Sequence, residues 1–274
     1  MEEKRVLCIH DLSCVGRCSL AVVLPVLSAC GHMACPLPTA LLSTHTGGLG
    51  TPARTDETAF CRDALAHWAG LELSFDGVYS GYLAGAAQAG LVQQAFAAFP
   101  GAFKLVDPVL GDGGRPYRFV TPELQAAMAG LCRGADLITP NVTESALLLG
   151  LDPALPLTRR DALTRAQTLR EAFGAAVVLT GVAFAEGGHA NVCAGEVGAV
   201  CVPYEPVPGQ FPGTGDLFSA ALLGILLRGR PLPRAMKQAA DFVRAAAAGA
   251  GEDPRFGVPF EAQLPLLYKE EEPC

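Results

Sequence analysis

Short apolar runs alternate with longer segments of helical period along most of the chain, and this alternation constrains the fold more than any other feature. Strands that alternate with helices form parallel βαβ units, because a crossover helix returns the chain to the same edge of the sheet. The expected strands are residues 6–9, 33–38, 75–79, 103–106, 136–139 and 176–180. The expected helices are residues 18–30, 56–69, 84–99, 122–131, 163–173 and 232–248, with others after Pro140 and after Gly213. The sequence therefore predicts an α/β fold.

Several local signals refine this prediction. Thr55 or Asp56 is expected to cap the helix at 56–69, and Thr121 before Pro122 is a typical helix start. Glycine turns between short β segments predict antiparallel hairpins within residues 181–202. No linker, repeat or low-complexity stretch interrupts the 274 residues, so we expect one domain over 1–274, with an acidic tail at about 269–274 that is mobile.

Composition narrows the choice of partners and compartment. A net charge of -7 argues against a nucleic-acid surface, which needs clustered Lys and Arg. No run reaches the roughly 18 apolar residues of a membrane span, and the first residues do not have the pattern of a secretory signal. We therefore expect a cytoplasmic protein without a membrane partner, in which any anionic ligand is held by backbone amides, helix N-termini or a metal ion.

Ten cysteines raise the possibility of disulfides, zinc or thiol redox chemistry. No Cys-x-x-Cys pair occurs, and most of the cysteines lie inside apolar runs such as the one around Cys8. This placement is typical of small core residues in a reducing compartment.

The motif Gly213-Thr214-Gly215-Asp216 lies directly before an apolar helical run. Backbone N–H groups in the first turn of a helix have no intrahelical acceptor, and the helix dipole adds positive potential there, so an anion can bind. Asp216, in that first turn, is a candidate general base for a hydroxyl that is being phosphorylated. Alone, the motif is more typical of a capped helix after a glycine turn.

Polar clusters at successive strand ends strengthen the catalytic interpretation. In open parallel sheets, ligands bind outside the carboxyl ends of the strands. Carboxylate and amide oxygens there are the ligands that Mg²⁺ prefers, and Mg²⁺ bridges the phosphates of ATP. The clusters run from His10 to Ser13, from Asp107 to Asp112, from Thr139 to Glu144, and at Thr180, with Asp107, Asp112, Asn141 and Glu144 as the oxygen donors. Asx turns at the two aspartates, and helix N-terminal charge at Glu144, are the structural alternatives.

Three common site motifs are absent from the sequence. It has no P-loop, no Gly-x-Gly-x-x-Gly after the first strand and no Gly-x-Ser-x-Gly, which disfavours P-loop enzymes, nicotinamide-dependent enzymes and serine hydrolases. His45 and Thr46, beside two glycines in the loop at 42–50, are candidates to hold a polar ring.

With these motifs the chain resembles the ribokinase-like superfamily and, within it, the pyridoxal (vitamin B6) kinases. The resemblance covers nearly the whole chain and implies a central, mostly parallel sheet flanked by helices on both faces, a homodimer, and ATP, Mg²⁺ and in many members K⁺ as cofactors. It implies transfer of the ATP γ-phosphate to a hydroxymethyl group on a heteroaromatic ring. The matching motifs are Ser43-Thr44-His45-Thr46-Gly47, Ser80-Gly81-Tyr82, Asp107-Pro108-Val109-Leu110-Gly111-Asp112, Ile138-Thr139-Pro140-Asn141 with Glu144, and Gly213-Thr214-Gly215-Asp216.

The resemblance also implies roles for individual positions. Asp216 matches the family's catalytic base, and Gly213, Thr214 and Gly215 match its anion hole. Thr46 and Tyr82 match substrate-pocket positions, with His45 beside them. The positions that match the metal and ATP-phosphate side are Asp107, Thr139, Asn141, Glu144, Thr180 and Gly213, with Asp107 and Glu144 on the metal and Asp112 in the loop that covers ATP.

One departure from the family bears on the substrate. Asp11 stands where the family has a substrate-contacting serine, and a carboxylate there suits the amine of pyridoxamine. The nearest alternative is hydroxymethylpyrimidine (phosphate) kinase, a relative that typically has cysteine at the position of Asp216. A non-catalytic protein that binds nucleotide or vitamin is a second alternative, which the complete set of phosphate-side groups disfavours.

Overall fold

The structure, a computed structural model, describes residues 3–195, 198–251 and 253–268, so the acidic tail at 269–274 lies outside the described residues. Most of its strands join one sheet, and β6 and β7 form a separate small hairpin. The strands are β1 (Arg5–Ser13), β2 (Met33–Leu42), β3 (Arg54–Asp56), β4 (Gly77–Ser80), β5 (Phe103–Val106), β6 (Gly111–Asp112), β7 (Arg115–Pro116), β8 (Leu137–Ile138), β9 (Ala176–Ala183), β10 (His189–Gly195) and β11 (Gly198–Pro203).

The large sheet has the strand order β11-β10-β9-β8-β5-β4-β1-β2-β3. The pairs from β2 through β1, β4, β5 and β8 to β9 are parallel, and β3, β10 and β11 add antiparallel edges. The mostly parallel sheet and the antiparallel hairpins after β9 confirm the predicted fold class. After β1 the chain moves first to β2 on one side and later to β4 on the other, which makes the carboxyl ends of β1 and β4 a topological switch point.

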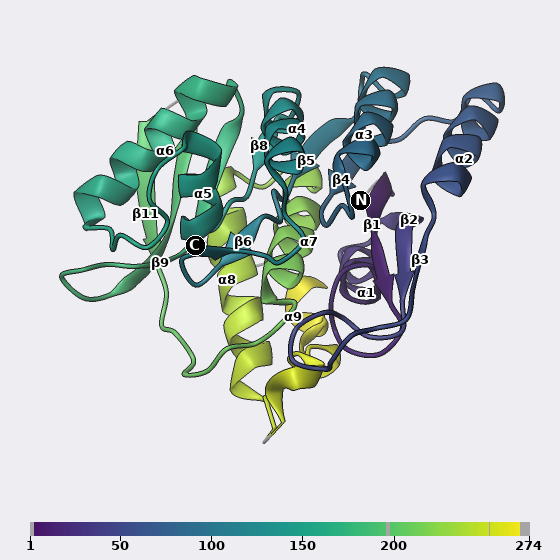
Figure 1. The fold of residues 1–274 in the computed structure, drawn as a ribbon. Helices are drawn as coiled ribbons and strands as arrows, with labels where there is room; N and C mark the ends of the chain where they lie inside the picture. The colour runs from purple at the N-terminus through teal and green to yellow at the C-terminus, as the bar shows by residue number, and fades with distance from the viewer. Residues whose placement is uncertain (1–2, 196–197, 252, 269–274) are drawn as a thin grey trace.

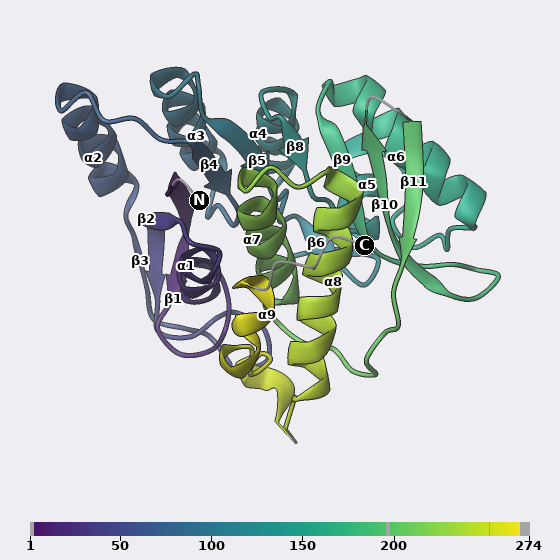
Figure 2. The same ribbon diagram turned by 180° about the vertical axis from the view of Figure 1, so that it is seen from behind.

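Helices cover both faces of the sheet. In Figure 1 the helices α2 to α6 lie in front of the strands, and in Figure 2 the helices α1, α7, α8 and α9 lie in front. The helices are α1 (Leu20–Ala29), α2 (Thr58–Gly70), α3 (Ala86–Ala98), α4 (Pro122–Arg133), α5 (Val142–Leu149), α6 (Arg159–Phe173), α7 (Thr214–Leu227), α8 (Leu232–Ala248) and α9 (Pro265–Tyr268), with 3₁₀ turns at Pro254–Phe256 and Glu261–Gln263.

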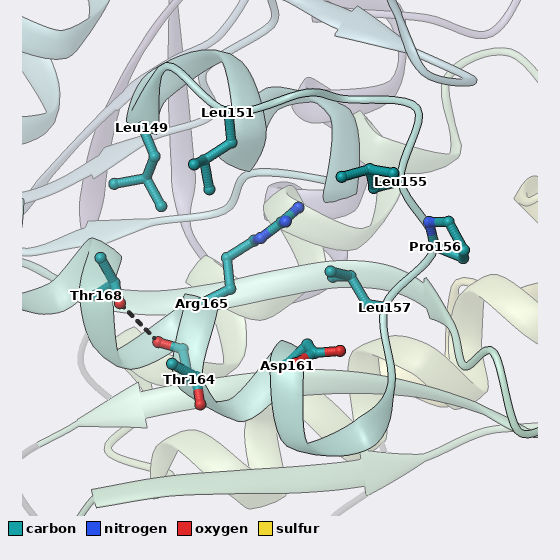
Figure 3. A pocket seen from close by; sticks show the side chains of 9 residues that line it. All are labelled: Leu149, Leu151, Leu155, Pro156, Leu157, Asp161, Thr164, Arg165 and Thr168. Atoms are coloured by element: carbon teal, nitrogen blue, oxygen red, sulfur yellow. Dashed lines mark hydrogen bonds between the residues drawn. The ribbon is translucent and has the colours of Figure 1, made fainter.

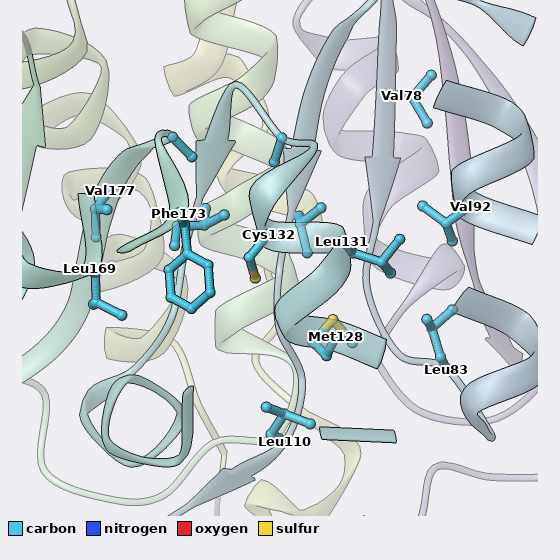
Figure 4. Close-up of a cluster of buried hydrophobic side chains, with 14 of the residues drawn as sticks. Val78, Leu83, Val92, Leu110, Met128, Leu131, Cys132, Leu169, Phe173 and Val177 are labelled. Carbon is cyan, nitrogen blue, oxygen red and sulfur yellow. The ribbon is translucent and has the colours of Figure 1, made fainter. Parts of the chain in front are cut away.

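Successive residues of the central strands divide between two hydrophobic cores. In β1, Leu7 and Ile9 join the core under α2 to α6, whereas Val6 and Cys8 join the core under α1, α7 and α8. This period of two is that of a strand buried on both faces, and each fully buried aliphatic side chain contributes about 1.5–3 kcal/mol. Figure 4 shows part of the first core, where Met128 and Leu131 of α4 lie near Leu83, and Leu169 and Phe173 of α6 lie near Val177 of β9.

Some element bounds differ from the sequence predictions. Helix α2 begins at Thr58 rather than at Asp56, because Asp56 pairs with β2 as the end of β3 and its carboxylate accepts a hydrogen bond from Thr58 N at 2.8 Å. Helix α6 begins at Arg159, four residues earlier than predicted, because Thr158 forms a capping box with Asp161. The short strands β3, β6 and β7 were not predicted, since each depends on pairing with a partner and not on apolar periodicity.

The cysteines of the described residues are free thiols, and most are buried, as expected for core residues. Burial raises the pKa of the Cys61 thiol to about 11, which leaves it protonated and unreactive at neutral pH. No helix of the described ranges combines the length and apolarity that a bilayer crossing requires.

Candidate active site

The carboxyl ends of the parallel strands bring the predicted polar residues to one edge of the sheet. Asp11 lies at the end of β1, Tyr82 follows β4 and Asp107 follows β5. Backbone hydrogen bonds continue between neighbouring strands past their ends, from Gly81 N to Ile9 O at 3.1 Å and from Asp107 N to Ser80 O at 2.8 Å. The strand-end clusters therefore lie side by side at the switch point, as the sequence predicts.

Helix α7 presents its N-terminus to this edge. Its N-cap is Gly213, which has a left-handed backbone (φ 79°) and no side chain to satisfy the first-turn amides. A β-carbon on Gly213 would lie 1.9 Å from the carbonyl oxygen of Arg17, whereas one on Gly215 would meet nothing within 4 Å. The Thr214 hydroxyl donates to Phe211 O at 3.0 Å. The first-turn amides of α7 are therefore left for a ligand, which is the arrangement that binds an anion.

Asp216 lies in the first turn of α7, and its Oδ2 accepts a hydrogen bond from the backbone N–H of Ser19 at 2.8 Å. Burial raises the pKa of the Asp216 carboxyl to about 7, against the lowering effect of that hydrogen bond, and the charge of Asp11 raises it further. A carboxylate with a pKa near neutrality is well matched to accept a proton from an alcohol during a reaction.

Asp107 and Thr139 meet through the buried hydroxyl of Ser219, three residues along α7 from Asp216. Ser219 Oγ donates to Asp107 Oδ2 at 3.1 Å and lies 3.0 Å from Thr139 Oγ1. Burial raises the pKa of the Asp107 carboxyl to about 8, and the charge of Asp216 adds to the increase. Ser219 thus fixes the orientation of the Asp107 carboxylate, whose ionised form is destabilised by burial.

Glu144 and Asn141 form a capping box at the start of α5. Glu144 Oε2 accepts from Asn141 N at 2.8 Å, and Asn141 Oδ1 accepts from Glu144 N at 2.9 Å. Glu144 Oε1 also accepts from Leu110 N at 3.2 Å. Burial, and then the charge of Asp107, raise the pKa of the Glu144 carboxyl. The capping role considered as an alternative is therefore present, and it orients the same carboxylate toward the Asp107 side of the site.

The donor set around Asp107 and Glu144 fits a magnesium ion that is also bound by substrate. Both carboxylates are buried, each with a raised pKa, and neither makes a salt bridge within the described part of the chain. The same part contains no cluster of three or more His, Cys, Asp or Glu residues able to enclose a metal. Mg²⁺ commonly takes one or two carboxylates together with waters and substrate phosphates, so two acidic ligands are sufficient.

Among the residues predicted to bind the substrate, His45 is buried and its two ring nitrogens are both engaged. Gly47 N donates to Nδ1 at 3.1 Å, so Nε2 carries the proton and donates to Arg255 O at 2.6 Å. His45 thus braces its loop against the chain near Arg255, while Thr46 beside it is exposed. Burial, followed by the charge of Asp11, raises the pKa of the half-buried Tyr82.

The remaining predicted residues lie farther along the same edge. Asn141 Nδ2 donates to Gly111 O at 2.8 Å and so connects α5 to the β6–β7 hairpin. Asp112 is exposed in that hairpin and accepts from Gly113 N at 2.7 Å. The Thr180 hydroxyl donates to Pro140 O at 3.4 Å, and Thr180 pairs with Asn141 through an isolated bridge.

Ser19 and Ser219 are the site residues that the sequence analysis missed. Ser219 had a detectable signal, because residues three apart on a helix share a face and Asp216 was already placed on α7. The sequence signal for Ser19 was weak, because a serine at the start of an apolar helical run is typical of an ordinary N-cap.

Two hollows lie outside this edge. One, of about 310 Å³, lies between α5, α6 and their connection, where the Arg165 side chain extends past Leu149, Leu151 and Leu157 (Figure 3). The other, of about 440 Å³, lies between α4 and the end of α5. No predicted site residue lines either one, so both are separate from the strand-end cluster.

Comparisons with known proteins agree with the fold and the motifs. A family model described as phosphomethylpyrimidine kinase matches residues 24–258. A pyridoxal kinase PdxY of Deinococcus radiodurans is 36% identical over 167 residues, which are 56% of this chain and 55% of that protein. A pyridoxine/pyridoxal/pyridoxamine kinase of Bordetella bronchiseptica is 33% identical over 188 residues, 64% of this chain and 65% of that protein. The matches thus span less than two thirds of these curated relatives.

Solved structures match over almost the whole chain. A candidate phosphomethylpyrimidine kinase of Bacteroides thetaiotaomicron, crystallised with pyridoxal, has a TM-score of 0.90 and 34% identity and covers 99% of this chain and 98% of its own. A pyridoxal kinase of Lactobacillus plantarum has a TM-score of 0.88 and 35% identity, with 97% of each chain covered. The chain therefore belongs to the phosphomethylpyrimidine kinase family, within the ribokinase-like superfamily that its motifs predict.

Proposed function

We propose that this protein is an ATP-dependent kinase that phosphorylates the 5′-hydroxymethyl group of B6 vitamers (pyridoxal, pyridoxamine and pyridoxine), with Asp216 as general base. One observation carries the proposal. A carboxylate whose pKa is raised to about 7 lies in the first turn of a helix whose N-cap lacks a side chain. A proton acceptor therefore lies beside a binding site for a phosphoryl group. Phosphoryl transfer to an alcohol requires both features.

In the proposed mechanism, Asp216 accepts the proton of the substrate hydroxyl as that oxygen attacks the γ-phosphorus of ATP. The amides of Gly213 to Gly215 stabilise negative charge on the transferring phosphoryl group, and the bond to ADP breaks. The substrate ring lies between the loop of Thr46 and Tyr82, with Asp11 near its substituents and His45 bracing the loop. Positioning and electrostatics supply most of the acceleration, since phosphoryl transfer needs little covalent help from the protein.

The ATP side of the site consists of the residues at the ends of β5, β8 and β9. Asp107 and Glu144 would hold Mg²⁺, which neutralises charge on the β- and γ-phosphates when it is bound. Asp112 on the β6–β7 hairpin would lie over the nucleotide, and K⁺ is a further proposed cofactor. The other proposed phosphate-side residues are Thr139, Asn141, Thr180 and Gly213.

The relatives support the B6 substrate class. The curated relatives are named for pyridoxal, and the Bacteroides structure holds pyridoxal. The alternative is phosphorylation of hydroxymethylpyrimidine or its phosphate, which the description of the matching family model favours. Asp216 argues for the B6 vitamers, because the pyrimidine-kinase branch typically has cysteine there. We further propose that residues 1–274 form one kinase domain that acts as a cytoplasmic homodimer.

The test is a product assay with the purified protein and Mg·ATP. Pyridoxal, pyridoxamine, pyridoxine and hydroxymethylpyrimidine are supplied separately, and each product is identified by mass. We expect a phosphorylated product from at least one B6 vitamer. Phosphorylation of hydroxymethylpyrimidine alone would support the alternative, and no phosphorylated product from any of the four would contradict both functions.

A further inference from the structure

We propose that Ser19 is the positioning residue of the base: its main-chain N–H directs Asp216, and its side chain ties this peptide to Asp11. The inference deepens the proposed function and rests on it for the role of Asp216. In this role Ser19 acts through the carboxylate that it holds.

Two hydrogen bonds from one residue make this connection. Ser19 N donates to Asp216 Oδ2 at 2.8 Å, and Ser19 Oγ donates to Asp11 Oδ1 at 2.5 Å. Ser19 and Asp11 are both buried, with 6% and 3% of their surfaces exposed. Ser19 therefore connects the carboxylates of Asp11 and Asp216, which lie about 200 residues apart in the sequence, and its burial shields these hydrogen bonds from water.

The backbone of Ser19 has an unusual conformation. Its φ of 51° and ψ of -134° lie in a region that residues with a β-carbon rarely adopt. Within the described residues, the only other non-glycine residue with positive φ is Glu72, which lies in an exposed turn after α2. A buried residue keeps such a conformation only when its surroundings hold it there, and such residues concentrate at functional sites.

The chain before Ser19 is held on both sides. Arg17 N donates to Phe256 O at 3.0 Å, and Arg17 Nε donates to Glu261 at 2.7 Å. Gly16 lies against the His45 ring, since a β-carbon there would come within 2.6 Å of it. These contacts fix the position of the turn before Ser19. The hydrogen bond from the Ser19 hydroxyl to Asp11 then fixes the peptide group that carries the Ser19 N–H.

This arrangement gives Asp11 a role that needs no contact with substrate. Its Oδ1 accepts from Ser19 Oγ, and its Oδ2 accepts from Ser13 Oγ at 3.0 Å. A carboxylate that selects an amine of the substrate would affect the KM of one vitamer more than another. A carboxylate that holds Ser19 affects kcat for every vitamer alike.

Three variants test the inference. Ser19→Ala removes the bond to Asp11 but keeps the β-carbon that opposes positive φ. Ser19→Gly removes the same bond but adopts that backbone without strain. Ser13→Ala removes the other hydroxyl from Asp11 and leaves Asp216 untouched, so it is the matched control.

We expect Ser19→Ala to lower kcat about 10- to 100-fold, with KM for ATP and vitamer within about twofold of wild type, because displacement of a reacting group by roughly 1 Å has an effect of that size. Ser19→Gly should recover part of the loss, and Ser13→Ala should lose less than about threefold. Equal kcat values for Ser19→Ala and wild type would overturn the inference, as would a loss in Ser19→Ala that Ser13→Ala matches.

Crystal structures of the wild type and of Ser19→Ala separate this inference from the proposed function. We expect residue 19 of the variant to leave the positive-φ region and its N–H to lose Asp216. An alanine that keeps both would contradict the inference, whether or not the wild type is active. A wild type that phosphorylates none of the four compounds would refute the proposed function alone, since the structural comparison would still decide whether Ser19 positions Asp216.

Discussion

The contact between Gly213 and Arg17 makes the substitution Gly213→Ala a sharp test of how the N-terminus of α7 is built. A methyl group at this position would lie 1.9 Å from Arg17 O, a distance that real β-carbons do not adopt, so the two segments must move apart. The left-handed backbone of Gly213 adds a cost of about 1–3 kcal/mol for any residue with a β-carbon. Overpacking of this kind adds about 1–3 kcal/mol.

We therefore expect Gly213→Ala to lower the free energy of unfolding by about 2–6 kcal/mol in urea titrations followed by circular dichroism. Gly215→Ala is the matched control, because its φ is not positive and nothing lies within 4 Å of the added methyl. Alanine is a better helix former than glycine, so this variant should be more stable than wild type by about 0.5–1 kcal/mol. Equal stability of the two variants would refute the steric reasoning.

Asp216→Asn should cut kcat by about 10²- to 10⁴-fold while the Kd of ATP, measured calorimetrically, stays near wild type; a variant that keeps wild-type turnover would remove Asp216 from the role of base. Because the base acts as the carboxylate and its pKa is about 7, kcat/KM for the vitamer should rise with pH up to about 7 and then level off, and a flat profile from pH 5 to 8 would contradict this. The folded-state pKa of Asp107, about 8, lies above its ordinary value of 3.8, so its contribution to stability is complete below pH 3.8 and is lost as the pH rises through 8. Asp107→Asn should accordingly have a higher Tm than wild type at pH 8 and a similar Tm near pH 4, and a lower Tm at pH 8 would contradict the assignment.

The positions of the strand-end residues could be predicted from the sequence, because hydrophobic runs followed by polar turns indicate the carboxyl edge of a parallel sheet. Asp107, Glu144 and Asp216 lie where this pattern predicts. The contact between Ser19 and Asp216 could not be predicted, since it joins residues 197 positions apart and uses a main-chain N–H that any residue type except proline provides. His45 shows the same limit, because nothing in its loop indicates the hydrogen bond to the carbonyl of Arg255, 210 positions away.

The short strands show a second limit of the same kind. β6 and β7 have two residues each and form only because Gly111 pairs with Pro116 and Asp112 pairs with Arg115. Such pairing leaves no apolar period in the sequence. It depends on the position of α5, since Asn141 holds the carbonyl of Gly111.

The order of the elements along the chain has a consequence for synthesis on the ribosome. All strands of the large sheet have emerged by Pro203, but α7 and α8, which cover much of one face, follow only from Thr214 onward. At about 5–20 residues per second, a nascent sheet with one face partly bare would persist for several seconds. Its apolar side is then open to aggregation or to a chaperone until the C-terminal helices dock. Because Asp216 lies in the first turn of α7, the active site cannot be complete before α7 has docked on its part of that face.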